Sequence, residues 1–304
     1  MLSPSGGQFE IVFEDQRVVV VEVGGGLRTY SVAGRDVIHG YGVEEMCTAG
    51  RGQVLIPWPN RLQDGSYEFD GRRHQLPLTE VEHSNAIHGL VRWAAWHVGE
   101  RESHRVLVQH VLHPRPGYPF SLALTIEYAL SDDGLAVRTT ATNVGEIPCP
   151  YGTGAHPYLT VGTPTVDDAV LLVPARTALR SDERGIPVGT FPVEGTELDF
   201  RVARSIGEAK IDNGFTDLER DESRTARVEL SGAGKAGLTL WVDESYPYVM
   251  VFTGDHSDVN RRGLAVEPMT CAPNALRSGD GLIRLEPGAS VTSVWGISPR
   301  RATP

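Results

Sequence analysis

The sequence predicts an all-β protein, built as a large and mostly antiparallel β-sandwich. Its apolar residues fall mainly in short runs bounded by turn residues, and 34 glycines and 20 prolines are spread along the 304 residues. Turn formers at this frequency leave little room for long helices but suit short strands joined by tight turns. Because no low-complexity linker or fixed-period repeat interrupts the pattern, we expect residues 1–304 to form a single domain.

Two hairpins carry the clearest strand patterns. Residues 66–76 place Asp70-Gly71 between two alternating runs, and glycine accepts the positive φ that a tight hairpin needs. Residues 122–143 alternate apolar with smaller or polar residues on both sides of a turn at 132–134, the pattern of a half-buried sheet. Strand patterns recur through residues 227–254 and 281–297.

One segment departs from the strand pattern. Residues 201–223 lack regular alternation, and we expect a brief helix there.

Composition and charge narrow the class of protein. A hydrophobic fraction of 40% with 22% charged residues is typical of a soluble globular protein, and no run approaches the roughly 18 apolar residues of a membrane span. The net charge of −11 would repel a phosphate backbone, so we expect no nucleic-acid partner. The first residues lack the basic and apolar regions of a secretory signal, and we expect a cytoplasmic protein.

The three cysteines give no sign of a disulfide or a zinc site. Cys47, Cys149 and Cys271 are far apart and form no CxxC pair. This spacing argues against a cysteine framework and favours buried, thiol-bearing hydrophobes.

Three segments place a titratable side chain among glycine, proline and aromatic residues. They are SNAIHGLVRW with His88, YGTGAHPYL with His156, and GLAVEPMT with Glu267. Gly89 and Pro157 directly follow the two histidines, as expected where a turning backbone aims a side chain into a cleft. The apolar run before Glu267 predicts a buried strand that ends by delivering the carboxylate into a proline-bracketed turn.

Other chemistries have weaker support. Two histidines and a glutamate can form a metal site, but no HxH or HExxH pair occurs and the three residues span nearly 180 positions. A serine nucleophile elbow, GxSxG, is absent. The triple glycine at 24–26 does not open a helix in a βαβ unit, so a bulge or a tight turn explains it.

Two segments have the composition of a polyol site. LIPWPNRL brings together Trp58, Asn60 and Arg61, and an indole can cover sugar C–H faces while a guanidinium donates to hydroxyl oxygens. A tryptophan at the rim of the sandwich beside a surface arginine, with no role in binding, is an equally good interpretation of this segment. Asp212, close to Phe215, fits a sugar site and fits ordinary turn chemistry equally well.

Together and in this order, the segments resemble the aldose 1-epimerase (galactose mutarotase) family. PWPNRLQDGSYEFDGRRHQLPLTE, NAIHGLVRWAAWHV, GAHPYLTVG and AVEPMTCAPNAL match its motifs from about residue 50 to residue 280. HGLVRW with GAHPYL is closer to the small bacterial branch that includes sulfoquinovose-type mutarotases. The resemblance implies a β-supersandwich with no metal or organic cofactor.

The resemblance also implies roles for individual residues. Glu267 would be the base that takes the anomeric hydroxyl proton, His156 the acid that protonates the ring oxygen, and His88 a hydrogen-bond partner of that oxygen. Arg61, Asn85 and Asp212 would bind the sugar hydroxyls, and we expect Trp58 and Tyr158 to be substrate-binding residues as well. An aromatic residue often follows the family's second His-x-Tyr, and here the residue is Leu159.

Mutarotation fits these groups chemically. One proton leaves O1 while another reaches O5, so a carboxylate and an imidazolium suffice, and we expect mutual attraction to hold both in their charged forms. The partner is then a small sugar. A hexose-phosphate mutarotase and a non-catalytic carbohydrate-binding module remain alternatives, as do a monomer and a homodimer.

Overall fold

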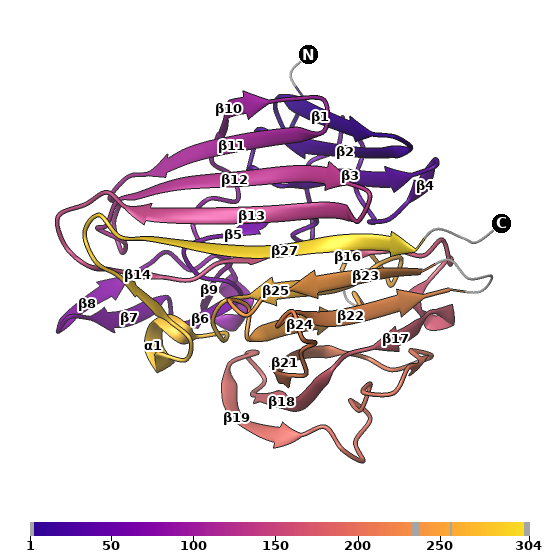
Figure 1. Cartoon of the computed structure of the whole chain (residues 1–304). Helices are drawn as coiled ribbons and strands as arrows, with labels where there is room; N and C mark the ends of the chain where they lie inside the picture. Colours follow the sequence, from indigo (N-terminus) through magenta and orange to yellow (C-terminus); the bar gives the residue numbers. More distant parts are fainter. Residues whose placement is uncertain (1–2, 233–236, 256, 301–304) are drawn as a thin grey trace.

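The computed structural model describes residues 3–232, 237–255 and 257–300, and strands make up most of its regular structure. The larger sheet has nine strands. In spatial order they are β10 (His97–Arg101), β11 (Arg105–Leu112), β12 (Leu122–Ser131), β13 (Gly134–Asn143), β27 (Ser290–Arg300), β23 (Gly237–Val242), β22 (Ala226–Ser231), β17 (Val170–Leu172) and β20 (Arg204–Ser205). The long strands β12, β13 and β27 cross the middle of the molecule (Figure 1).

A second large sheet has eight strands. Its order is β19 (Pro187–Pro192), β18 (Ala175–Ser181), β21 (Asp212–Leu218), β24 (Tyr248–Phe252), β25 (Leu264–Met269), β15 (Gly154–Ala155) and β5 (Val54–Leu55), with β16 (Tyr158–Leu159) also paired to β25. Neighbouring strands in both large sheets pair antiparallel, for example β12 with β13 and β24 with β25. The predicted all-β, mostly antiparallel architecture is confirmed.

Smaller sheets and short helices complete the described structure. The small sheets are β1 (Gln8–Phe13), β2 (Gln16–Val21), β3 (Leu27–Val32) and β4 (Arg35–Asp36), and the pairs β6 (Arg61–Gln63) with β9 (Asn85–Ile87), β7 (Ser66–Phe69) with β8 (Arg72–Gln75), and β14 (Cys149–Tyr151) with β26 (Ile283–Leu285). The helices are η1 (Val81–His83), η2 (Val166–Asp168) and α1 (Ala275–Ser278). None of the described helices has the length and apolar content to cross a membrane.

The two predicted hairpins are confirmed, as β7–β8 and β12–β13. The brief helix expected within residues 201–223 is wrong, because that segment contains β20 and β21. There, Phe215 is buried, and Gly214 leaves room on its strand for the side chain of Leu179. Tertiary packing therefore selects strand where local composition predicted helix.

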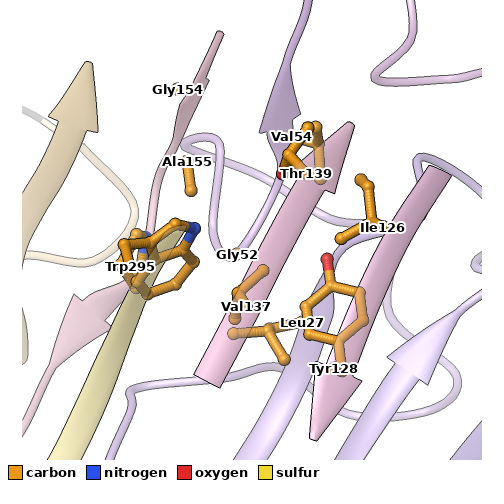
Figure 2. A pocket seen from close by; sticks show the side chains of 11 residues that line it. Leu27, Gly52, Val54, Ile126, Tyr128, Val137, Thr139, Gly154, Ala155 and Trp295 are labelled. Carbon is orange, nitrogen blue, oxygen red and sulfur yellow. The ribbon is translucent and has the colours of Figure 1, made fainter. Parts of the chain in front are cut away.

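The core lies between the two large sheets. Figure 2 shows Trp295 of the nine-stranded sheet beside Ala155 of the eight-stranded sheet, and Ile126, Tyr128 and Val137 line the same small space. The space enclosed at this point has a volume of only about 10 Å³, so the side chains are closely packed. Because Ala155 precedes His156, this packing fixes the backbone that carries a predicted catalytic residue.

Candidate active site

A cavity of about 340 Å³ opens on the eight-stranded sheet, and one face of three adjacent strands forms its floor. Glu267 on β25 pairs directly with Met250 on β24, and Phe252 on β24 pairs with Asp212 on β21. Since side chains alternate between the two faces of a strand, these four share one face. Two carboxylates thus lie on either side of an apolar strip, an arrangement that suits a ring with hydroxyl edges and C–H faces.

The strand that carries Glu267 continues beyond it to Met269, so the prediction of a turn immediately after Val266 is wrong. Pro268 is tolerated inside the strand for a local reason. The N–H of Val266 donates to the carbonyl of Pro157 at 3.2 Å, so the nitrogen of residue 268 faces the same side, where β15 and β16 leave a gap. A missing N–H is least costly there.

His156 lies in this gap, between β15 and β16. Its ring stacks on Tyr158 with centroids 5.0 Å apart and planes inclined by 19°. On another side, Gly50 allows the close approach, because a Cβ there would lie 2.8 Å from Cδ2 of His156. The Tyr158 hydroxyl donates to the carbonyl of Ala49 at 3.1 Å. These contacts fix the imidazole plane.

A sharp turn presents His88 to the same cavity. His88 and Gly89 both have positive φ, 62° and 71°, and a Cβ on Gly89 would lie 2.0 Å from the carbonyl oxygen of Ile56. Nδ1 of His88 accepts a hydrogen bond from the backbone N–H of Asn60 at 3.2 Å. Burial, reinforced by the charges of His156 and Arg92, lowers the pKa of His88 well below its usual value. The neutral ring therefore carries its proton on Nε2, which can donate.

His156 and Glu267 form a buried pair. Nε2 of His156 lies 3.3 Å from Oε1 of Glu267, and the two residues are 5% and 2% exposed. Their other polar atoms, Nδ1 and Oε2, have no hydrogen-bond partner in the part of the chain that the structure describes. Burial lowers the pKa of His156 to about 3. Burial and the charge of Asp212 raise the pKa of Glu267 well above its usual value, an effect that Arg61 partly offsets.

These shifts change the expected charge state of the pair. Attraction between His156 and Glu267 was expected to keep both charged, but desolvation dominates and favours the uncharged forms. The uncharged pair and the ion pair contain the same number of protons. A single transfer across the 3.3 Å contact interconverts them, so the site holds one acid and one base in either state.

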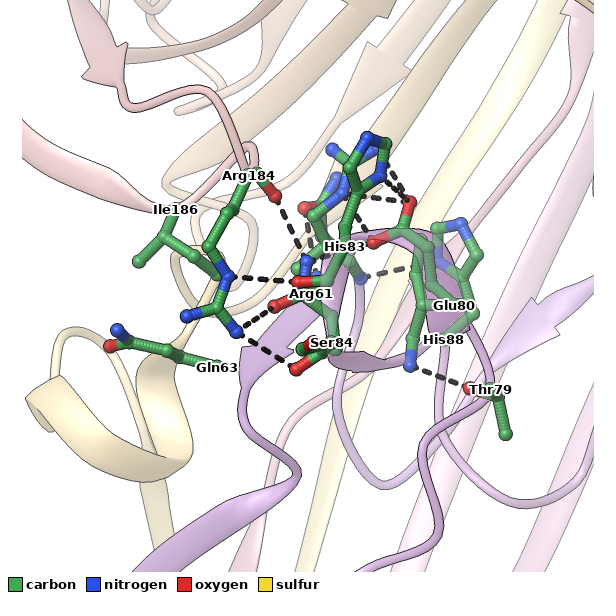
Figure 3. A network of polar contacts seen from close by, with 12 residues as sticks. Arg61, Gln63, Thr79, Glu80, His83, Ser84, His88, Arg184 and Ile186 are labelled. Atoms are coloured by element: carbon green, nitrogen blue, oxygen red, sulfur yellow. Dashed lines mark hydrogen bonds and ion pairs between the residues drawn. The ribbon is translucent and has the colours of Figure 1, made fainter.

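Arg61 lines the cavity, and only two of its three guanidinium nitrogens are used in hydrogen bonds to Glu80. Its Nε and Nη2 donate to both carboxylate oxygens of Glu80 at 3.0–3.1 Å (Figure 3). Nη1 makes no hydrogen bond within the described residues, which leaves donors for a hydroxyl group. Asp212 lines the same cavity, where partial desolvation of its carboxyl raises the pKa and the charge of Arg61 partly offsets that effect.

Tyr158 lines the cavity with Glu267, His156, His88, Arg61 and Asp212, but two other predicted sugar contacts do not. Trp58 is 2% exposed because its indole packs into the hydrophobic core, and it lines a different cavity. Asn85 is fully buried and donates to Glu80 and to the carbonyl of Arg184. Neither side chain lines the cavity that holds the other predicted residues.

The structure adds lining residues that the sequence did not single out. They are Ala49, Gly50, Thr79, Glu80, Glu82, Ile87, Arg92, Met250, Phe252 and Ser257, and the lining also includes Asn60, which the sequence had placed beside Arg61. Met250 and Phe252 had a detectable signal, because they alternate along a run that already read as a strand. Thr79, Glu80, Glu82 and Ile87 had none, because they reach the site through the pairing of β9 with β6 and the bridge between Glu80 and Asn85. Within the described ranges, no His, Cys, Asp or Glu cluster of three or more has the geometry of a metal site.

The fold is that of galactose mutarotase-like proteins. A GalM/aldose epimerase homologue from C. elegans superposes with a TM-score of 0.84 over 97% of this chain and 99% of that one, at 18% identity. A galactose 1-epimerase from Lactobacillus acidophilus gives a TM-score of 0.78 over 96% and 94%, at 22% identity. At these identities the likeness shows the fold.

Sequence comparison assigns the family. Residues 10–298 match the family model described as aldose 1-epimerase, and the chain therefore belongs to the aldose 1-epimerase family. It is 35% identical to the uncharacterized protein YihR of Escherichia coli K12 over 285 residues, 93% of this chain and 90% of that protein. It is 30% identical to the aldose 1-epimerase of the same organism over 210 residues, 66% and 60%.

Proposed function

We propose that residues 1–304 form one domain that interconverts the α and β anomers of a free aldose or a simple derivative of one. The contact between Glu267 and His156 carries this proposal: an acid and a base lie 3.3 Å apart, buried in a cavity of sugar-binding character. Binding alone does not need such a pair, so the arrangement favours an isomerase over a non-catalytic carbohydrate-binding module.

The reaction follows from moving two protons. Glu267 accepts the O1 proton while His156 donates a proton to O5, so that the C1–O5 bond breaks and a C1 aldehyde forms. Rotation about the C1–C2 bond presents the other face of the aldehyde, and the reverse transfers close the ring. The Nε2–H of His88 supports the charge that develops on the ring oxygen. The sugar hydroxyls are held by Arg61 and Asp212.

For this direction of transfer, Glu267 must be ionised while His156 is protonated. A sugar hydroxyl that donates to the carboxylate and a ring oxygen that accepts from the imidazolium favour the ion pair over the uncharged pair. Ring opening leaves Glu267 protonated and His156 neutral. Reclosure then needs no other group, because Glu267 can return a proton to O1 while His156 accepts one from O5. One pair therefore serves both directions.

The charges around the cavity favour an uncharged sugar over a phosphorylated one. Its lining contains the carboxylates of Glu80, Glu82, Asp212 and Glu267. The lining guanidinium groups are those of Arg61 and Arg92, and Glu80 already pairs with the first. A dianionic phosphate would require more positive charge than this lining offers.

Polarimetry with fresh α-anomers tests the proposal. The protein is expected to accelerate mutarotation of at least one sugar among glucose, galactose, xylose and sulfoquinovose, and to favour glucose over glucose 6-phosphate. Rates equal to buffer for every sugar would contradict the proposed activity. A preference for glucose 6-phosphate would retain the reaction class and overturn the substrate charge.

The pH dependence of kcat/KM is expected to have a wide plateau. Activity requires the His156–Glu267 pair to share a single proton. The pair gains a second proton only when the pH falls near the lowered pKa of His156. It loses its single proton only when the pH rises to the raised pKa of Glu267. After subtraction of the buffer rate, the acid limb should therefore lie well below pH ~6.5, the pKa of an ordinary histidine. An inflection at that ordinary value would show a solvated imidazole and contradict the buried pair.

A further inference from the structure

We propose that the turn joining β18 to β19, residues 182–186, positions Arg61 for sugar binding through Arg184 and Gly185. The inference rests on the proposed function and assigns a task to residues outside the 340 Å³ cavity. Arg184 and Gly185 line a neighbouring cavity of about 290 Å³ instead, and its lining shares Arg61 and Asp212 with the first. They therefore act through Arg61 rather than on the reacting atoms.

Arg184 fastens this turn to the segment that follows β8. Its Nε donates to the carbonyl of His83, and its Nη2 donates to the carbonyl of Ser84 and to Oδ1 of Asp64, each at 2.8 Å (Figure 3). Ser84 has a positive φ of 54°, the left-handed conformation with which η1 ends. One guanidinium thus holds these three acceptors together, although each lies 100 or more residues away in sequence.

A buried amide passes this constraint to Arg61. The Nδ2 group of Asn85 donates to the carbonyl of Arg184 at 2.9 Å and to Oε2 of Glu80 at 2.8 Å. Oδ1 of Asn85 accepts from Nη2 of Arg184 at 3.3 Å. Glu80 then holds Nε and Nη2 of Arg61. Because Asn85 has no exposure to solvent, water cannot replace these bonds without local opening.

Gly185 closes the other side of the guanidinium. A Cβ at this position would lie 2.5 Å from Nη1 and 2.8 Å from Cζ of Arg61. The φ of Gly185 is +74°, so the turn needs glycine for its backbone as well as for the close approach. Glu80 on one side and the turn on the other leave Arg61 a single orientation. Its free Nη1 is thereby preorganised for a hydroxyl group, which reduces the entropic cost of binding.

Steady-state kinetics of sugar exchange tests the assignment. Arg184→Ala is expected to raise KM about three- to tenfold, the effect of losing one well-formed hydrogen bond, while kcat stays within about twofold. Arg184→Lys should give an intermediate KM, because an ammonium cannot span the same acceptors. Gly185→Ala should raise KM without removing any side-chain hydrogen bond. Hydrogen exchange in residues 79–87 should increase in Arg184→Ala.

A double-mutant cycle separates positioning from general stability. In an Arg61→Ala background, Arg184→Ala is expected to leave KM unchanged, because its effect passes through Arg61. Arg277→Ala is the matched control, since Arg277 also pairs with Asp64, at 3.2 Å, and makes no hydrogen bond or ion pair with residues 79–87 in the part of the chain that the structure describes. It should keep the parental KM.

Two results would overturn the assignment. One is a KM equal to that of the parent in both Arg184→Ala and Gly185→Ala. The other is an increase in KM on Arg184→Ala that has the same size whether or not Arg61 is present. Failure of Arg184→Ala to fold leaves Arg184→Lys and Gly185→Ala to decide in the same way. A parent protein with no exchange activity on any sugar would instead refute the proposed function, so the two failures are distinguishable.

Discussion

Replacing Glu267 with glutamine is expected to slow anomer exchange by about 10²–10⁴-fold, the usual contribution of a positioned acid or base. An amide has the shape of the carboxyl group but cannot accept the O1 proton. The dissociation constant of the sugar, measured by calorimetric titration, should change only a few-fold. Glu68→Gln, on an exposed face of β7, is a matched control that should keep the parental rate. Unchanged exchange in Glu267→Gln would overturn the base assignment.

The same variant is expected to be more stable than the parent near neutral pH. The pKa of Glu267 is raised in the folded protein, so its contribution to stability is fully present below the ordinary carboxyl pKa and is lost as pH rises toward the raised value. Glutamine does not titrate. The difference in melting temperature should therefore be largest at neutral pH and should shrink toward pH ~4. A destabilised variant would show that Glu267 is ionised and well paired in the folded state.

Replacing His156 with alanine is expected to reduce kcat by about 10²–10⁴-fold, because the ring oxygen loses its proton donor. The loss should appear mainly in kcat, since the proposed mechanism assigns proton transfer to His156 and assigns hydroxyl binding to Arg61 and Asp212. Polarimetry at saturating sugar measures it directly.

His97 offers a matched control for that substitution. It lies exposed on β10, and His97→Ala should keep the parental kcat. Added imidazole is expected to restore part of the activity of His156→Ala by entering the vacated volume. A fully active His156→Ala variant would remove His156 from the mechanism.

Local patterns predicted much of the fold. The hairpins β7–β8 and β12–β13 follow from alternation around Asp-Gly turns, signals that lie within a few residues of each other. Strand β21 was missed because Asp212 and Gly214 have low strand propensity, and packing against Leu179 overrides that propensity. The order of strands in the two large sheets depends on pairings between distant segments, such as β13 with β27, which no local pattern carries.

The candidate site shows the same difference between residues that local sequence indicates and residues whose place depends on distant contacts. His88, His156 and Glu267 stood out because each occurs in an unusual local sequence, and the structure brings all three to one cavity. Trp58 lies in the core, and the local sequence did not indicate this because a tryptophan between prolines occurs both at a rim and in a core. The hydrogen bond of Asn85 to the carbonyl of Arg184 was not visible in the sequence, since the two residues are 99 positions apart.

The charge state of the pair also lay beyond the sequence. Spacing along the chain carries no information on desolvation, which dominates the shifts of both His156 and Glu267. That effect becomes visible only in the folded structure, where His156 and Glu267 are 5% and 2% exposed. Residue identity therefore indicated the chemistry, while the fold determined its energetics.

Exchange spectroscopy by NMR on an equilibrium mixture of anomers tests the central claim most directly. Magnetisation transfer between the α and β H1 signals reports the exchange rate with no coupled enzyme and no net reaction. The parent protein is expected to give strong cross-peaks with a neutral aldose, whereas Glu267→Gln and His156→Ala give rates near that of buffer. Equal cross-peaks in the parent and in both folded variants would contradict the assignment of catalysis to the Glu267–His156 pair.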